Sequence, residues 1–168
     1  MIIHDSVFFH KRIAFEKLNG IKVIPLWFFY PDKEDIDNRK RIMRHLKNYQ
    51  VLDNKLSNEP VMLGLPHDKW FGCFGVQSYI NLHFLEGIEH KYGITKLISA
   101  VQCRRDRCCL ERIFGCIFFT ECQNIIHKKS LLGNIMKYQT WGYSYDDYME
   151  HLKKGTIPAP VVKVWSGR

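Results

Sequence analysis

The stretch RRDRCCLERIFG, residues 104–115, places four arginines, Asp106 and Glu111 directly before the apolar run CIFF at residues 116–119. A segment that is charged at its start and apolar beyond it is typical of a helix that enters a hydrophobic core. We therefore predict a central helix over residues 103–122, with Asp106 near its start. Its charges are then held in a fixed place, and we expect the chemistry of the chain there.

Length and composition bound the fold. The chain has 168 residues, of which 46% are hydrophobic, and this is enough for one core. We predict a single domain over residues 1–168 with a mixed α and β fold (α/β in the broad sense, α+β), in which helices cover a small mixed sheet.

The formal net charge of +8 favours anionic partners, among them nucleic acid, acidic membranes and nucleoside or sugar phosphates. No apolar run reaches the roughly 20 residues that span a bilayer, and Met1 leads into a strand-like segment rather than a signal sequence. We therefore expect a soluble, cytoplasmic protein.

The six cysteines contain no Cys-x-x-Cys pair, and most of them lie within the apolar pattern of the central helix. That spacing suits neither a zinc knuckle nor a secreted disulfide scaffold. Reduced, packed thiols are the main interpretation, because free cysteine is among the most buried residue types. A redox or metal role is the alternative.

Hydrophobic periodicity predicts the elements around the central helix. Strands are expected over residues 1–9, where His4-Asp5-Ser6 interrupts an apolar run, and over residues 22–30, where Pro25 indicates a strand end or an edge. Helices are expected over residues 32–49 and over residues 82–92, the second ended by Gly93. Residues 54–60 are expected to form a loop, residues 95–101 a helix or short strand, and the tail an extended ending.

Two further patterns invite a functional interpretation. The aromatic segment 70–80 contains Gly72 and Gly75, which let a backbone come close to another group. The helix at residues 32–49 carries a basic face, which is either an ordinary solvated surface or an anion-facing patch; its cations are Arg39, Lys40, Arg44 and Lys47.

Asp106 has two interpretations, which are compatible with each other. A carboxylate at a helix start accepts backbone hydrogen bonds and interacts with the positive end of the helix dipole. It can also serve as a general base for an incoming hydroxyl. Arg107 and Glu111, four residues apart, predict a helix-surface ion pair. Arg104, Arg105, Arg107 and Arg112 together would suit a diphosphate, because guanidinium forks match phosphate oxygens.

The triplet His4-Asp5-Ser6 is also ambiguous. It is either a hydrogen-bonded polar kink in a strand or a place where a carboxylate and an imidazole reach a divalent metal.

The succession of these motifs resembles the acceptor-side, C-terminal half of GT-A-type nucleotide-sugar glycosyltransferases. The resemblance rests on His4-Asp5-Ser6, the segment Gly72-Cys73-Phe74-Gly75, a helix that begins near Phe84, and the Arg/Asp/Glu start of the central helix. The endings WGY at residues 141–143 and KVWSGR at residues 163–168 are also similar to glycosyltransferase-like proteins of large DNA viruses.

The resemblance implies transfer of a sugar from a nucleotide-sugar donor to a glycan or other hydroxyl acceptor. Asp5 and His4 would contact a divalent metal, manganese or magnesium, although the triplet offers one carboxylate where the family has two. Asp106 would be the catalytic base. The nucleotide-binding N-terminal half would be missing, so the chain would be a fragment, one half of a split enzyme with a complementing partner, or a homologue without activity. The implied donor and phosphate-binding residues are Asp5, Arg104, Arg105 and Arg107, and the implied acceptor-side residues are Trp70, Gly72, Gly75 and Gln77.

Two other classes stay open. A basic nucleic-acid-binding module would use the cations of residues 32–49 and aromatic stacking. A zinc-binding interaction protein is the third possibility.

Overall fold

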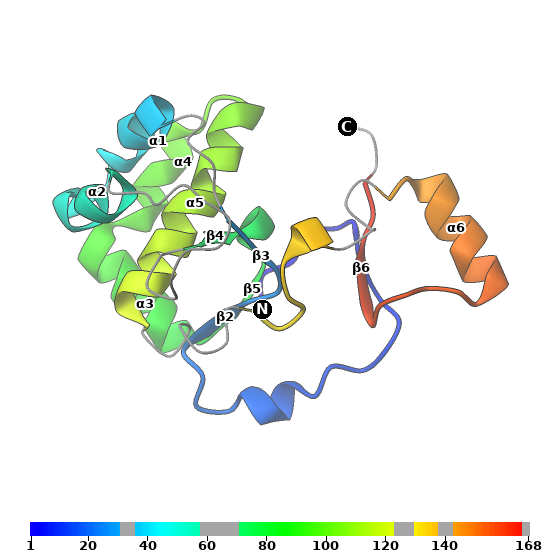
Figure 1. The fold of residues 1–168 in the computed structure, drawn as a ribbon. Helices are drawn as coiled ribbons and strands as arrows, with labels where there is room; N and C mark the ends of the chain where they lie inside the picture. Colours follow the sequence, from blue (N-terminus) through cyan, green and yellow to red (C-terminus); the bar gives the residue numbers. More distant parts are fainter. Residues whose placement is uncertain (31–35, 58–70, 123–129, 138–142, 166–168) are drawn as a thin grey trace.

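The computed structural model describes residues 1–30, 36–57, 71–122, 130–137 and 143–165 (Figure 1). Within these residues the fold is mixed α and β, as predicted. The expected small sheet is divided into three antiparallel pairs of short strands. The described helices are α1 (Ile36–Met43), α2 (Tyr49–Ser57), α3 (Leu82–Tyr92), α4 (Leu97–Ala100), α5 (Arg104–Glu121) and α6 (Tyr145–Lys154).

Helix α5 is the centre of the main hydrophobic core, which confirms the helix predicted over residues 103–122. It contacts α1, α2 and strand β4 (Gly72–Cys73). Ile113, Ile117 and Phe118 are fully buried on it. Burying side chains of this size stabilises a fold by about 1.5–3 kcal/mol each, so the apolar part of α5 fixes the helix in place.

The predicted strand over residues 22–30 is two strands in the structure. Strand β2 (Val23–Pro25) pairs with β5 (Ser78–Ile80), and β3 (Phe28–Phe29) pairs with β4. Pro25 ends β2, as expected of a residue without a backbone donor. Leu26 and Trp27, between the two strands, are fully buried. Because residues 23–30 are apolar throughout, hydrophobic periodicity did not predict the break between the two strands.

Two glycines allow α5 and the strands to approach closely. A Cβ on Gly115 of α5 would lie 2.0 Å from the carbonyl oxygen of Phe71 and 3.0 Å from the backbone nitrogen of Cys73. A Cβ on Gly72 would lie 2.2 Å from the Phe29 ring. The close approach predicted at Gly72 is thus confirmed, and Gly115 extends it to the central helix.

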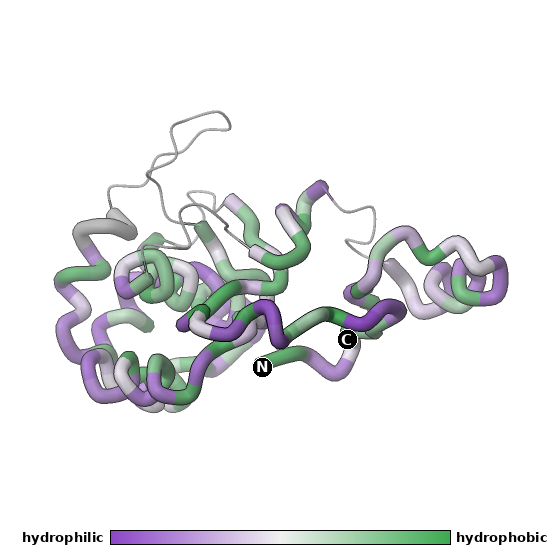
Figure 2. The backbone as a smooth tube through the Cα atoms, turned by 90° about the horizontal axis from the view of Figure 1, so that it is seen from below, coloured by the Kyte–Doolittle hydropathy of each residue, from purple (hydrophilic) through white to green (hydrophobic). Residues whose placement is uncertain are grey.

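The first and last parts of the chain pair with each other. Strand β1 (Val7–Phe9) is antiparallel to β6 (Val161–Lys163), with Val7 opposite Lys163. Helix α6 covers this pair through Tyr148, whose ring stacks on Phe8 at 4.7 Å between centroids. Figures 1 and 2 both show α6 apart from the group of helices α1 to α5. The tail from residue 130 therefore contains a helix that was not predicted, and strand β6 confirms its expected extended ending.

Helix boundaries follow local capping rules. The Asn81 side chain accepts hydrogen bonds from the backbone of His83 and Phe84 at the start of α3, and Gly93 ends the helix in the left-handed conformation at φ 64°. The helix predicted over residues 82–92 is confirmed. At α6, the Ser144 hydroxyl accepts from the Asp147 backbone, and Gly155 follows the last turn.

Several other boundaries need correction. In the described part of the helix predicted over residues 32–49, α1 ends at Met43, residues 44–48 form turns, and α2 begins at Tyr49. Helix α2 continues to Ser57, so the described part of the loop predicted over residues 54–60 is helical. Residues 95–101 are mostly helical, through η3 (Ile94–Lys96) and α4. The triplet at residues 4–6 precedes β1 in a turn instead of interrupting a strand.

All six cysteines are free thiols, and four of them are buried, which confirms the interpretation of reduced, packed side chains. None of the described helices is both long enough and apolar enough to cross a bilayer.

Candidate functional site

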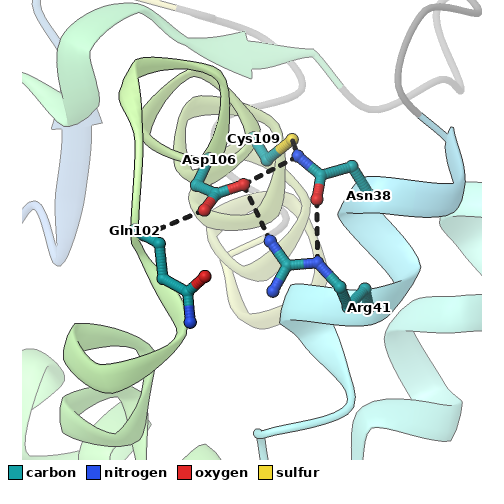
Figure 3. Close-up of polar contacts among 5 residues, drawn as sticks. All are labelled: Asn38, Arg41, Gln102, Asp106 and Cys109. Atoms are coloured by element: carbon teal, nitrogen blue, oxygen red, sulfur yellow. Dashed lines mark hydrogen bonds and ion pairs between the residues drawn. The ribbon is translucent and has the colours of Figure 1, made fainter.

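Asp106 lies in a hydrogen-bonded network between α5 and α1 (Figure 3). One carboxylate oxygen accepts from the Asn38 amide at 2.9 Å and from the Arg41 guanidinium at 2.8 Å. The other accepts from the backbone N–H of Gln102 at 2.8 Å, just ahead of the helix. Arg41 in turn donates to the Asn38 side-chain oxygen at 2.9 Å, which closes the network. Asp106 is thereby fixed from three directions.

These contacts bear on the two interpretations of Asp106. The residue at the N-cap position is Cys103, and Asp106 stands in the first turn, from where it satisfies an N–H that precedes the helix. The Gln102 and Asn38 hydrogen bonds, with the Arg41 charge, hold the pKa of the Asp106 carboxyl well below its usual range. A general base should have a pKa near the working pH, so this environment favours anchoring of α5 over proton abstraction by Asp106.

An open pocket of about 790 Å³ adjoins this network. Arg41 and Arg105 contribute cations to its wall, whereas Asp37 and Asp106 contribute carboxylates. Asp106 forms an ion pair with Arg41 at 2.8 Å. The other charged residues that line the pocket are Arg105 and Asp37.

A second polar group forms around a strained turn between β4 and β5. Gly75 and Val76 both have left-handed backbone conformations, with φ 61° and φ 56°, and the backbone N–H of Gln77 closes the turn on the Phe74 carbonyl at 3.1 Å. A β-branched residue such as Val76 rarely adopts this conformation. Strain of this kind amounts to about 1–3 kcal/mol and is concentrated at functional sites.

Glu111 of α5 faces this turn. Its Oε1 accepts a hydrogen bond from the Gly75 backbone N–H at 2.9 Å. Burial raises the pKa of Glu111 to about 7, although the Gly75 hydrogen bond and the Arg112 charge oppose the shift. Near neutral pH this carboxyl can therefore both take up and release a proton, as an acid–base catalyst must.

Gln77 and His4 lie on the other side of Gly75. A Cβ on Gly75 would meet the His4 ring at 2.7 Å and the Gln77 Nε2 at 2.9 Å. The His4 backbone N–H donates to the Gln77 side-chain oxygen at 3.3 Å. Burial, and secondarily the Lys163 charge, lower the pKa of His4. The structure thus brings His4, Gly75 and Gln77 together.

The triplet around Asp5 has a cation beside it. The Lys163 ammonium donates to the Ser6 hydroxyl and lies close enough to Asp5 and His4 to influence the ionisation within this group. Among the described residues there is no cluster of three or more histidine, cysteine, aspartate or glutamate side chains that could hold a metal. With one carboxylate and a neighbouring ammonium, Asp5 and His4 do not by themselves fit the divalent metal site that the resemblance implies.

The predicted cations divide into exposed and buried ones. Arg104, Arg105 and Arg107 are exposed on the first turn of α5. Arg39, which was predicted on the basic solvent face, is only 1% exposed. The position of Arg39 on the inner side of α1 beside Ile42 and Met43 explains this difference.

The two polar groups lie on different sides of α5. Asp106 faces α1, whereas Glu111 faces the Gly75 turn, so the predicted base and the predicted acceptor-side residues Gly75 and Gln77 are not brought together. Trp70 lies outside the described residues, and Gly72 packs in the core instead. Glu111 had been predicted to pair with Arg107; its partner is the Gly75 N–H, 36 residues earlier in the chain. In the sequence, only the glycine-rich segment Gly72-Cys73-Phe74-Gly75 pointed to a backbone that could approach Glu111 closely.

No protein-family model, curated protein or solved structure matches this chain.

Proposed function

We propose that this chain serves in the transfer of a sugar from a nucleotide-sugar donor to a hydroxyl acceptor. The observation that carries the proposal is the start of α5, where anchored Asp106 leaves Arg104, Arg105 and Arg107 exposed along one turn. Guanidinium groups bind phosphate oxygens in pairs, and the first turn of a helix adds partial positive charge. A nucleoside diphosphate is an anion and a leaving group, so it fits this charge.

The order of the motifs gives the proposal its second support. The resemblance to the acceptor-side half of GT-A enzymes places an acceptor against the segment that contains Gly75 and Gln77. That segment carries a strained turn beside an ionisable carboxyl, Glu111. Base-assisted sugar transfer has two requirements. Cationic side chains stabilise the leaving phosphate, and a carboxylate accepts the proton of the acceptor hydroxyl.

The resemblance covers the acceptor-side half of such an enzyme, so the first property to measure is whether the arginines at the start of α5 bind a diphosphate without the nucleotide-binding half. Isothermal titration calorimetry with UDP and GDP, and with uridine as the uncharged comparison, tests it directly. We expect both diphosphates to bind and uridine not to bind. Replacing Arg104, Arg105 and Arg107 with glutamine should weaken diphosphate binding at least tenfold, since charge-assisted hydrogen bonds contribute about 1.5–3 kcal/mol each.

The matched control changes the same amount of charge elsewhere. Lys11, Lys17 and Lys153 are exposed and lie outside α5, and their replacement with glutamine should leave UDP affinity within twofold of the wild type. Equal loss of affinity in both triple variants would show a general charge effect and would contradict the proposal. So would the absence of any diphosphate binding.

Nucleic acid is the competing anion. Arg44 and Lys47 are exposed beyond α1 and support that alternative, although Arg39 does not, since it is buried. A single-stranded oligonucleotide of about 20 nucleotides distinguishes the two ligands. Binding that falls steeply with salt and is not displaced by UDP would favour nucleic acid over sugar transfer.

A further inference from the structure

The pocket beside the Asp106 network has a wall that combines charges of both signs with a thiol. Its volume of about 790 Å³ lies within the range of pockets that hold small molecules, roughly 300–1,000 Å³. Arg41 and Arg105 supply guanidinium groups to the wall. Asp37 supplies an exposed carboxylate, and Cys103 supplies a thiol. A ligand that matches this wall carries carboxylate, ammonium and sulfur groups together.

The cations of the wall can hold the carboxylates of a ligand. The contacts of Arg41 with Asn38 and Asp106 use two of the five N–H groups of its guanidinium, and its side chain is 46% exposed. Arg105 is exposed on the first turn of α5. The first turns of α1 and α5 both line the pocket, so the positive ends of two helix dipoles add to these cations. The carboxylate of Asp37, in contrast, suits an ammonium.

Cys103 differs from the other cysteines of the chain in its exposure. It occupies the N-cap position of α5 in an extended backbone conformation, and its side chain does not cap the helix. It is exposed, whereas Cys108 is half-buried and the other four cysteines are buried. A molecule in the pocket therefore reaches the thiol of Cys103, and accessible thiols are the ones that exchange with disulfides.

We infer that the pocket between α1 and α5 binds a small zwitterionic thiol peptide and that Cys103 forms a mixed disulfide with it. Such a peptide carries two carboxylates, one ammonium and one thiol, as glutathione does. Its carboxylates bind Arg105 and Arg41, and its ammonium binds Asp37. A cationic disulfide would be repelled by the two arginines, and a disulfide without an ammonium would leave Asp37 unmatched. Cys103 is thus a site of reversible modification.

The exchange uses the disulfide form of the peptide as its oxidant. Cys103 gives its proton to water, and its thiolate attacks one sulfur of the disulfide. A bond forms between the Cys103 sulfur and that sulfur, and the original bond between the two ligand sulfurs breaks. The departing half takes the electron pair as a thiolate and is protonated by water. Cys103 is oxidised, one half of the disulfide is reduced, and attack by a second thiol reverses the step.

Rates of mixed-disulfide formation in the full chain test the pocket. The probes are oxidised glutathione, dithiodipropionate, which has the same net charge but no ammonium, and neutral bis(hydroxyethyl) disulfide. Intact mass spectrometry gives each rate, and peptide mapping locates the modified cysteine. Each rate is divided by that of the same disulfide with N-acetylcysteine amide. Cys103 should then react at least tenfold faster with oxidised glutathione than with the neutral disulfide, because charge-assisted hydrogen bonds hold the peptide beside the thiol.

Two arginine variants separate the pocket from general positive charge. Arg105→Gln removes a cation from the pocket wall and should slow the reaction with oxidised glutathione about threefold to tenfold. Arg104→Gln removes the same charge one residue earlier. Arg104 is exposed but is not among the described residues that line the pocket, so this matched control should stay within twofold of the wild type.

Asp37→Asn tests the ammonium contact. Loss of this carboxylate makes the wall more positive, so the reaction with dithiodipropionate should be unchanged or faster. The same variant should slow the reaction with oxidised glutathione about threefold, because the ammonium loses its partner. Asp146→Asn, in the exposed first turn of α6, is the matched control and should change neither rate.

Four outcomes would contradict recognition by this pocket. Equal normalised rates for the three disulfides would overturn it, and so would modification that begins at Cys108. Equal effects of Arg104→Gln and Arg105→Gln would overturn it, because they indicate long-range charge alone. Faster reaction of the Asp37→Asn protein with both anionic disulfides would exclude the ammonium contact. None of these measurements requires a nucleotide or a sugar, so they stand apart from the test of sugar transfer.

Discussion

Replacing Gly115 with alanine tests the close approach of α5 to the strand below it. The new Cβ would lie 2.0 Å from the Phe71 carbonyl oxygen, about 1.4 Å short of ordinary contact, and 3.0 Å from the Gly72 Cα. All of the atoms it meets belong to backbone, so no side-chain rotation relieves the overlap. Overpacking of this kind costs about 1–3 kcal/mol or more, and the better helix propensity of alanine offsets about 1 kcal/mol.

We therefore expect Gly115→Ala to lower the free energy of unfolding by about 2 kcal/mol and the Tm by roughly 4–8 °C. Gly87→Ala is the matched control, because Gly87 is a helical glycine in α3 with nothing within 4 Å of the added Cβ. It should raise stability by up to about 1 kcal/mol. Urea unfolding followed by tryptophan fluorescence and calorimetry measure both. A Gly115→Ala protein as stable as Gly87→Ala would refute the close helix–strand contact.

Three further predictions follow from local features. Asp106→Asn should be less stable than the wild type at pH 7, and the difference in the free energy of unfolding should shrink below pH 4. The pKa of the Asp106 carboxyl is lower in the folded protein than its unfolded value of about 3.9, so the ionised carboxylate stabilises the fold at pH values above 3.9, and this stabilisation is lost as the pH falls. Acid unfolding curves that stay parallel would contradict it. Val76→Asn should raise the free energy of unfolding by about 1 kcal/mol through relief of left-handed strain, which urea unfolding measures, and no gain would argue against strain. In thiol labelling followed by mass spectrometry, exposed Cys103 should react first, and equal reaction of buried Cys73 would exclude the described packing.

Local patterns predicted the elements whose signals are local. Helix α3 was predicted to the residue, since its start at Asn81 and its end at Gly93 are both capping positions. Helix α5 followed from its length and apolar face. Helix α6 was not predicted, although Ser144 and Gly155 provide the same kind of cap signals.

The candidate site depended on contacts that sequence spacing does not encode. Glu111 was paired with Arg107 by the four-residue rule, which considers a helix in isolation. Its hydrogen-bond partner, Gly75, comes from a turn 36 residues earlier. Likewise, the Asn38 and Arg41 partners of Asp106 lie 68 and 65 residues away. The residue types were visible from the sequence, whereas the side of α5 on which each acts was set by tertiary packing.

The pairing of β1 with β6 also constrains how the protein is made. During synthesis, strand β1 leaves the ribosome about 150 residues before β6, its only paired strand among the described residues. At ordinary translation rates that interval is roughly 8–30 s. For that time the backbone edge of β1 and the rings of Phe8 and Phe9 have no partner strand, while the core around α5 can already form. Chaperone binding and aggregation of nascent chains should therefore concentrate on the first ten residues.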